Sequence, residues 1–212
     1  MKIRAFLFLS LFLTLNIGAN ENSIFWELES PEGKQIFIFG SIHVDDNRVV
    51  DFSDSVNNAM KKSDLFVSET NNVNNLKALE GLGDEYNKYL SDEDFQKISE
   101  LSDFHSIETN FAIKLKPWLL GFIFSSPRAM NPFSQDNLLK VAASNYGLAS
   151  KGLETVDEHY SVLDSLSPED QFQILKNVLN LREVDKEKNY HLMIKTYLTF
   201  NLNKILNVDE EI

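Results

Sequence analysis

The sequence predicts an α/β fold, with a small mixed sheet and a large helical portion. Two apolar segments separated by strong turn residues predict an N-terminal β-hairpin over residues 24–39. A helical pattern and a further apolar strand follow, and strand 35–39, helix and strand together have the size of a βαβ unit. From residue 76 onward the apolar spacing is mostly helical. Few strands are therefore expected, nearly all of them close to the N-terminus.

The hairpin is predicted from alternating polarity and turn chemistry. Residues 24–29 mix apolar and polar side chains at period two, and residues 35–39 are almost purely apolar. Between them Pro31 fixes one backbone φ angle and Gly33 allows a positive one. Two strands joined by such a turn are expected to pair antiparallel.

The next segment predicts a helix and a third strand. Ser53 suits a helix N-cap, and three apolar residues then share one helical face as far as about residue 62. Residues 65–67 form an apolar strand that ends in Ser-Glu-Thr. Because strand–helix–strand crossovers are right-handed and make their strands parallel, strands 35–39 and 65–67 are expected to lie parallel and adjacent.

The remaining elements are predicted from capping residues and helical spacing. Ser91, Ser134 and Ser167 suit N-caps, and Pro117 and Pro168 suit first helical turns. Helices are expected over residues 76–90, 91–101, 106–115, 117–123, 134–146, 155–166 and 167–206, the last in one or two pieces, with a weak strand over 148–154.

Bulk composition excludes several classes of function. The 212 residues suit one domain, and 43% of them are hydrophobic, which is enough for a substantial core. The formal net charge of −12 argues against binding nucleic acid through a basic face. The absence of cysteine excludes disulfides, zinc–thiolate sites and thiol nucleophiles.

The N-terminus has the layout of a secretory signal peptide. Lys2 and Arg4 precede an apolar run over residues 5–17, and Gly18-Ala19 then offers small residues for cleavage. The run is short for a membrane span, which needs about 20 apolar residues. We therefore expect residues 1–19 to be removed, residues 20–212 to form a single domain, and the protein to be exported to the periplasm or the extracellular space without a stable membrane span.

Two polar residues at strand ends are the first candidates for a functional site. His43 follows strand 35–39 by way of Gly-Ser-Ile, and Glu69 ends the strand that begins at residue 65. If these strands are parallel neighbours, both side chains reach one sheet edge, where ligands of open α/β sheets bind. A His and a Glu are a partial site for Zn²⁺, Mn²⁺ or Co²⁺, or a base and its orienting partner.

Glu154 is a third candidate, because it closes the weak strand over 148–154. It reaches the same edge if that strand is parallel, but it equally suits the first turn of the next helix, where the helix dipole favours a carboxylate. His105, His159 and His191 have no partner at ligand spacing, so we expect surface or capping roles for them. No phosphate loop, nucleophile elbow or His-Glu-x-x-His helix is present.

Five stretches in order resemble the TraB/PrgY/GumN family, whose animal members are the TIKI proteins. They are Phe25-Trp26-Glu27-Leu28 with Pro31-Glu32-Gly33, Phe39-Gly40-Ser41-Ile42-His43-Val44, Asp64-Leu65-Phe66-Val67-Ser68-Glu69, Leu115-Lys116-Pro117-Trp118, and Gly152-Leu153-Glu154-Thr155. The first Gly-x-x-His motif of the family matches the stretch that contains His43, and its strand ending in a functional Glu matches the stretch that contains Glu69.

The resemblance implies a metal-dependent hydrolase of the protease type, acting on a peptide or protein substrate. It makes His43 and Glu69 both catalytic and metal-binding, and it leaves Glu154 as a further ligand or a supporting residue. The family site also uses a second Gly-x-x-His motif, and none follows Glu154 here. With the thin predicted sheet, this leads us to expect a domain shortened at its C-terminus, in which a homodimer supplies the missing strand and ligand.

Non-catalytic alternatives follow from the same incomplete site. One is a periplasmic binding protein for haem or another small ligand, with His43 as an axial ligand. Another is a truncated remnant that folds poorly.

Overall fold

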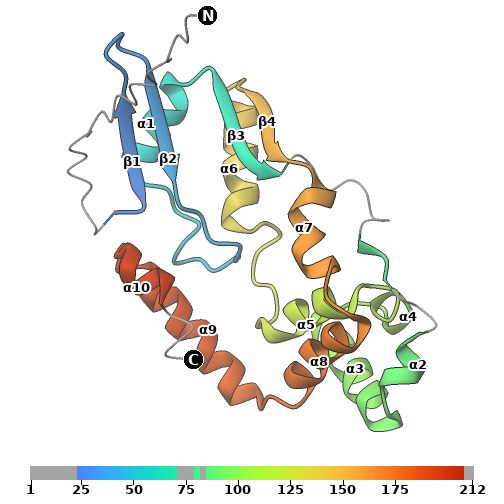
Figure 1. The fold of residues 1–212 in the computed structure, drawn as a ribbon. Coiled ribbons are helices and arrows are strands. Elements are labelled where there is room, and N and C mark those ends of the chain that lie inside the picture. Colours follow the sequence, from blue (N-terminus) through green and yellow to red (C-terminus); the bar gives the residue numbers. More distant parts are fainter. Residues whose placement is uncertain (1–22, 71–78, 82–84, 208–212) are drawn as a thin grey trace, which may run out of the picture.

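The computed structural model describes residues 23–70, 79–81 and 85–207, and it shows a mixed α/β chain (Figure 1). The predicted signal peptide, residues 1–19, lies outside the described residues. The elements in chain order are β1 (Phe25–Glu29), β2 (Gln35–Phe39), α1 (Asp54–Lys62), β3 (Leu65–Thr70), α2 (Tyr86–Tyr89), α3 (Asp92–His105), α4 (Thr109–Ala112), α5 (Pro117–Ser125), α6 (Gln135–Asn145), β4 (Ala149–Glu154), α7 (Val156–Asp164), α8 (Pro168–Leu179), α9 (Glu183–Tyr197) and α10 (Leu202–Leu206).

The described strands form two separate pairs. β1 and β2 make the predicted antiparallel hairpin, and Gly33 in its turn has φ +78°. β3 pairs in parallel with β4, which confirms the strand expected over 148–154. The prediction that β2 and β3 pair with each other in one mixed sheet is wrong, because each has its other partner and belongs to its own sheet.

Side chains hold the two sheets together where backbone hydrogen bonds do not. Val56 and Met60 of α1 and Leu139 of α6 form a buried cluster beneath them. Phe39 of β2 and Phe66 of β3 both pack against this cluster. The two strands therefore occupy one layer over α1 and α6, as Figure 1 shows, and the ends of β2 and β3 can still meet.

The sequence determines α1 locally, as predicted. The Ser53 side chain accepts a hydrogen bond from the backbone N–H of Val56, which satisfies one of the free donors of the first turn. Asp54 begins the helix and Lys61 and Lys62 end it, so the charges favour the helix dipole at both ends.

A second core lies within the helical portion, where residues of α2, α3, α4, α5 and α8 form the largest buried cluster. The helix expected over residues 76–90 is confined, in its described part, to α2. Residues 79–81 instead run beside the residues that follow α4. Glu80 forms a β-bridge with Leu115, and the backbone N–H of Gly81 donates to the carbonyl of Lys114 at 2.6 Å. A side chain at Gly81 would meet the Leu115 carbonyl oxygen at 2.5 Å, so only glycine permits this approach.

The C-terminal helical region is divided into α8, α9 and α10, where one or two pieces were expected. The break before α9 follows Asn180, which caps α8, and the break before α10 contains Phe200 in the left-handed region at φ +54°. α9 packs its buried residues Tyr190, Ile194 and Tyr197 against Ile24 and Val49 near the hairpin. Among the described residues, no helix is long and apolar enough to cross a membrane.

Asp164 of α7 joins two residues of the Lys-Pro-Trp stretch. Its carboxylate accepts from Lys116 Nζ at 2.6 Å and from Trp118 Nε1 at 3.1 Å. Trp118 is 1% exposed, so its indole N–H depends on this acceptor.

We expect Asp164→Ala to lower the free energy of unfolding by about 1–3 kcal/mol, because it leaves the buried N–H of Trp118 unpaired. Urea unfolding followed by circular dichroism measures the change. Asp185→Ala is the matched control: Asp185 pairs with the exposed Arg182 in a surface ion pair, whose loss costs about 0–1 kcal/mol. Equal losses in the two variants would contradict the role given to Asp164.

Candidate functional site

His43 lies in a loop that the N-terminus of α6 holds from both sides. The backbone N–H of Ile42 donates to the side-chain oxygen of Gln135 at 2.9 Å, and the backbone N–H of Gln135 donates to the carbonyl of Val44 at 2.8 Å. Gln135 is 3% exposed, so these bonds are shielded from water. The position of His43 is therefore fixed relative to the first turn of α6.

The imidazole of His43 lies between two carboxylates. Its Nδ1 is 3.0 Å from Asp136 Oδ1, and its Nε2 is 3.4 Å from Glu69 Oε2. The side chains of His43 and Glu69 are 61% and 58% exposed, whereas that of Asp136 is 20% exposed. The structure thus brings together His43 and Glu69, as the sequence predicted, although their strands do not pair.

The electrostatics of the site follow from these contacts. The hydrogen bond to Asp136 raises the pKa of His43 above its usual 6.5, and the charges of Asp136 and Glu69 add to this against the opposing effect of burial. Burial acts to raise the pKa of Asp136, but hydrogen bonds from His43 and Ser134 outweigh it and lower the pKa below 3.8. At neutral pH Asp136 is therefore an ionised acceptor for the Nδ1–H of His43.

In the metal-free protein, Asp136→Asn is expected to lower the pKa of His43, because it removes the largest cause of the upward shift. The stabilisation from this pair is fully present below the unfolded pKa of about 6.5 and is lost as the pH rises through the folded value. An NMR titration of the imidazole protons measures the pKa of His43. Asp185→Asn, at an unrelated ion pair, leaves the pKa of His43 unchanged. A wild-type pKa at or below 6.5 would contradict the geometry.

Glu154 does not join His43 and Glu69. In the β3–β4 register Thr70 lies opposite Glu154, and side chains alternate between the faces of a sheet, so Glu154 shares a face with Thr70 and not with Glu69. Its Oε1 is 2.6 Å from Nδ1 of His159 in the following helix. The pairing of His159 with Glu154 was not predicted from the sequence. Glu154 ends β4, and His159 lies about one turn into the helix that follows.

Asp136 and Gln135 are the site residues that sequence reasoning missed. Ser134 was identified as the cap of α6, and its hydroxyl in fact donates to Asp136 at 2.8 Å. A carboxylate in a first helical turn is ordinarily explained by the helix dipole, so Asp136 carried no distinct signal. An uncharged polar residue beside an N-cap, such as Gln135, gives even less indication in the sequence that it belongs to a site.

The pair fits two ligands of a tetrahedral metal ion. Two bonds of about 2.1 Å at the tetrahedral angle place the ligand atoms about 3.4 Å apart, and Nε2 of His43 lies 3.4 Å from the Glu69 oxygen. Asp136 on Nδ1 is the carboxylate that metal-binding histidines commonly carry on their other ring nitrogen. Within the described part of the chain, no group of three or more His, Asp or Glu residues is arranged to hold a metal.

Comparison with known proteins identifies the family. The model of the TraB/PrgY/gumN family matches residues 24–212, which include the hairpin, His43, Glu69 and every later element. No match was found among curated proteins or solved structures. The match extends over most of the chain, and the chain therefore belongs to the TraB/PrgY/gumN family.

Proposed function

We propose that the protein is an exported, divalent-metal-dependent hydrolase that acts on peptide bonds. The observation that supports this most is the separation of 3.4 Å between His43 Nε2 and Glu69 Oε2, with Asp136 on the opposite ring nitrogen. A bound Zn²⁺, Mn²⁺ or Co²⁺ ion would supply Lewis acidity that polarises a substrate carbonyl. Membership of the TraB/PrgY/gumN family agrees with this proposal.

Each residue of the site has a defined task in this proposal. His43 presents Nε2 as a ligand, and Asp136 holds the proton on Nδ1, which fixes the tautomer and the direction of the ring. Glu69 would be the second ligand; it would take up a proton from the attacking water and pass it to the amine that leaves when the peptide C–N bond breaks. The exposure of His43 and Glu69, 61% and 58%, leaves room for an extended substrate above them.

Catalytic zinc sites usually have three protein ligands, and the pair provides two. We propose that a second copy of the chain provides the third in a homodimer. Sedimentation equilibrium with Zn²⁺ and with a chelator tests this: the mass should double only with metal, and a monomer under both conditions would contradict it.

Hydrolysis of fluorescein-labelled casein with each of the three metals tests the function. Glu69→Gln is expected to reduce the rate at least about 100-fold, since it removes both a ligand and a proton acceptor. Glu154→Gln is the matched control and should keep the wild-type rate, because that carboxylate pairs with His159. Equal rates for wild type and Glu69→Gln, or full activity with a chelator, would contradict the proposal.

A further inference from the structure

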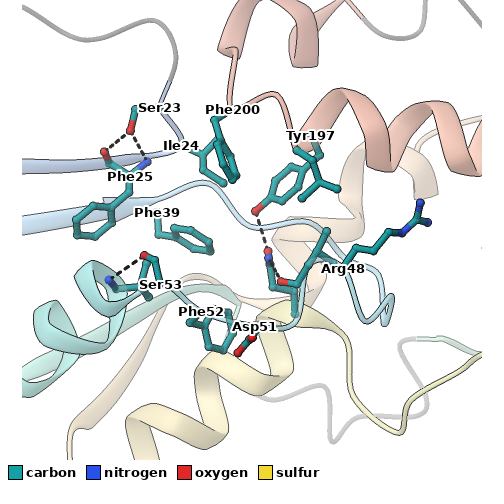
Figure 2. Close-up of a pocket in the computed structure, with 14 residues that line it drawn as sticks. Ser23, Ile24, Phe25, Phe39, Arg48, Asp51, Phe52, Ser53, Tyr197 and Phe200 are labelled. Atoms are coloured by element: carbon teal, nitrogen blue, oxygen red, sulfur yellow. Dashed lines mark hydrogen bonds between the residues drawn. The ribbon is translucent and has the colours of Figure 1, made fainter.

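A cavity that Gln135 helps to line is distinct from the surroundings of His43. The cavity, of about 230 Å³, opens between the hairpin, residues 48–53 and the end of α9 (Figure 2). His43, Glu69 and Asp136 are not among its lining residues. The cavity is thus separate from the proposed catalytic site, although Gln135 contributes to both.

The walls of the cavity are mainly aromatic and aliphatic. Four phenylalanines from three segments of the chain line it, together with the aliphatic side chains of Ile24, Val49, Val56 and Leu198. The phenylalanines are Phe25 and Phe39 of the hairpin, Phe52 before α1, and Phe200 after α9. Figure 2 shows the rings of Phe25, Phe39, Phe52 and Phe200 among the side chains that line the cavity.

Most polar side chains of the wall already have partners within the protein. The Tyr197 hydroxyl shares its one proton between two acceptors, Gln135 Oε1 at 3.0 Å and the carbonyl of Gly40 at 2.8 Å. Gln135 also donates to the carbonyl of Val49. Arg48 is held by Asp46 through two guanidinium bonds of 2.8 and 2.6 Å. Asp51 is the charged lining residue without a partner among the described residues; it is exposed, and its carboxylate disfavours an anionic occupant. Because the other polar side chains are paired, an occupant gains most from apolar contact.

Phe200 supports a binding role independently of the cavity. Its φ of +54° places it in the left-handed region, which bulky residues rarely adopt and in which glycine or asparagine is the usual choice after a helix. Backbone strain of this kind tends to occur at functional sites. The phenylalanine brings a ring to the wall of the cavity, which glycine at this position would not.

We propose that this cavity binds an uncharged aromatic ring system of about two fused rings. An engineered apolar cavity of about 150 Å³ takes up benzene, and the present volume of about 230 Å³ suits a bicyclic ring. Stacking and edge contacts with Phe25, Phe39, Phe52 and Phe200 provide the recognition. The proposal does not depend on the hydrolase function.

Titration with 1-aminonaphthalene, which is uncharged at pH 7, tests the proposal through the rise and blue shift of its emission. The wild-type chain is expected to bind one molecule. Phe200→Gly should weaken binding roughly tenfold through the loss of one ring contact, while thermal stability is kept or raised because the backbone strain is relieved.

Ser106→Gly is the matched control. Ser106 is the other non-glycine residue with positive φ among the described residues, at +59°, and it does not line the cavity. It should bind the probe as the wild type does. Absence of saturable binding, equal binding by Phe200→Gly and wild type, or tighter binding of the anionic 1-naphthoate would each overturn the proposal.

Discussion

Replacing Gln135 with alanine is expected to lower the free energy of unfolding by about 3–4 kcal/mol. The side chain accepts from the N–H of Ile42 and from the Tyr197 hydroxyl, and it donates to the carbonyl of Val49. Each buried polar group left unpaired costs about 1–3 kcal/mol, and Tyr197 keeps its bond to Gly40, which limits the total. The loss is therefore larger than for an ordinary buried glutamine.

Gln171→Ala is the matched control for this prediction. Gln171 is also buried, at 7% exposure, but its side chain makes one bond, to the carbonyl of Leu166 at 3.1 Å. Urea unfolding should show a loss of about 1 kcal/mol for it. If the two variants lose equal stability, Gln135 does not join α6, α9 and the loop that carries His43 as the structure indicates.

The local elements were predictable because short-range chemistry determines them. β2 was predicted with its observed bounds, and α1 begins after Ser53 because that hydroxyl caps it. The strand pairing was not predictable in the same way. A right-handed crossover gives the direction of β3 relative to β2, but β3 takes β4, which lies far along the chain, as its hydrogen-bonded partner.

The candidate site was predictable only in part. His43 and Glu69 stand at strand ends, where polar residues after apolar runs are visible in the sequence. Asp136 lies 93 residues after His43 in the chain, and only the tertiary contact between the His43 loop and α6 reveals it. Like Glu69, Glu154 is a polar residue at the end of a strand, but the side-chain alternation of β3 and β4 places the two side chains on opposite faces.

The second large effect is expected for His43→Ala, which should weaken Zn²⁺ binding at least about 100-fold. Loss of a supporting carboxylate alone typically costs 10–100-fold in metal affinity, and loss of a direct ligand costs more. The side chain is 61% exposed, so the free energy of unfolding should change by no more than about 1 kcal/mol. His191→Ala is the matched control, because His191 contacts Arg48 and is not among the ion-pair partners of His43.

The account depends most directly on one measurement, the titration of the chain from residue 20 onward with Zn²⁺ by isothermal calorimetry. Wild type and His191→Ala should bind the ion stoichiometrically and with equal affinity, and His43→Ala should lose binding while its unfolding curve stays nearly unchanged. Absence of binding by the wild type, or unchanged binding by His43→Ala, would contradict the assignment of His43 and Glu69 as a metal site.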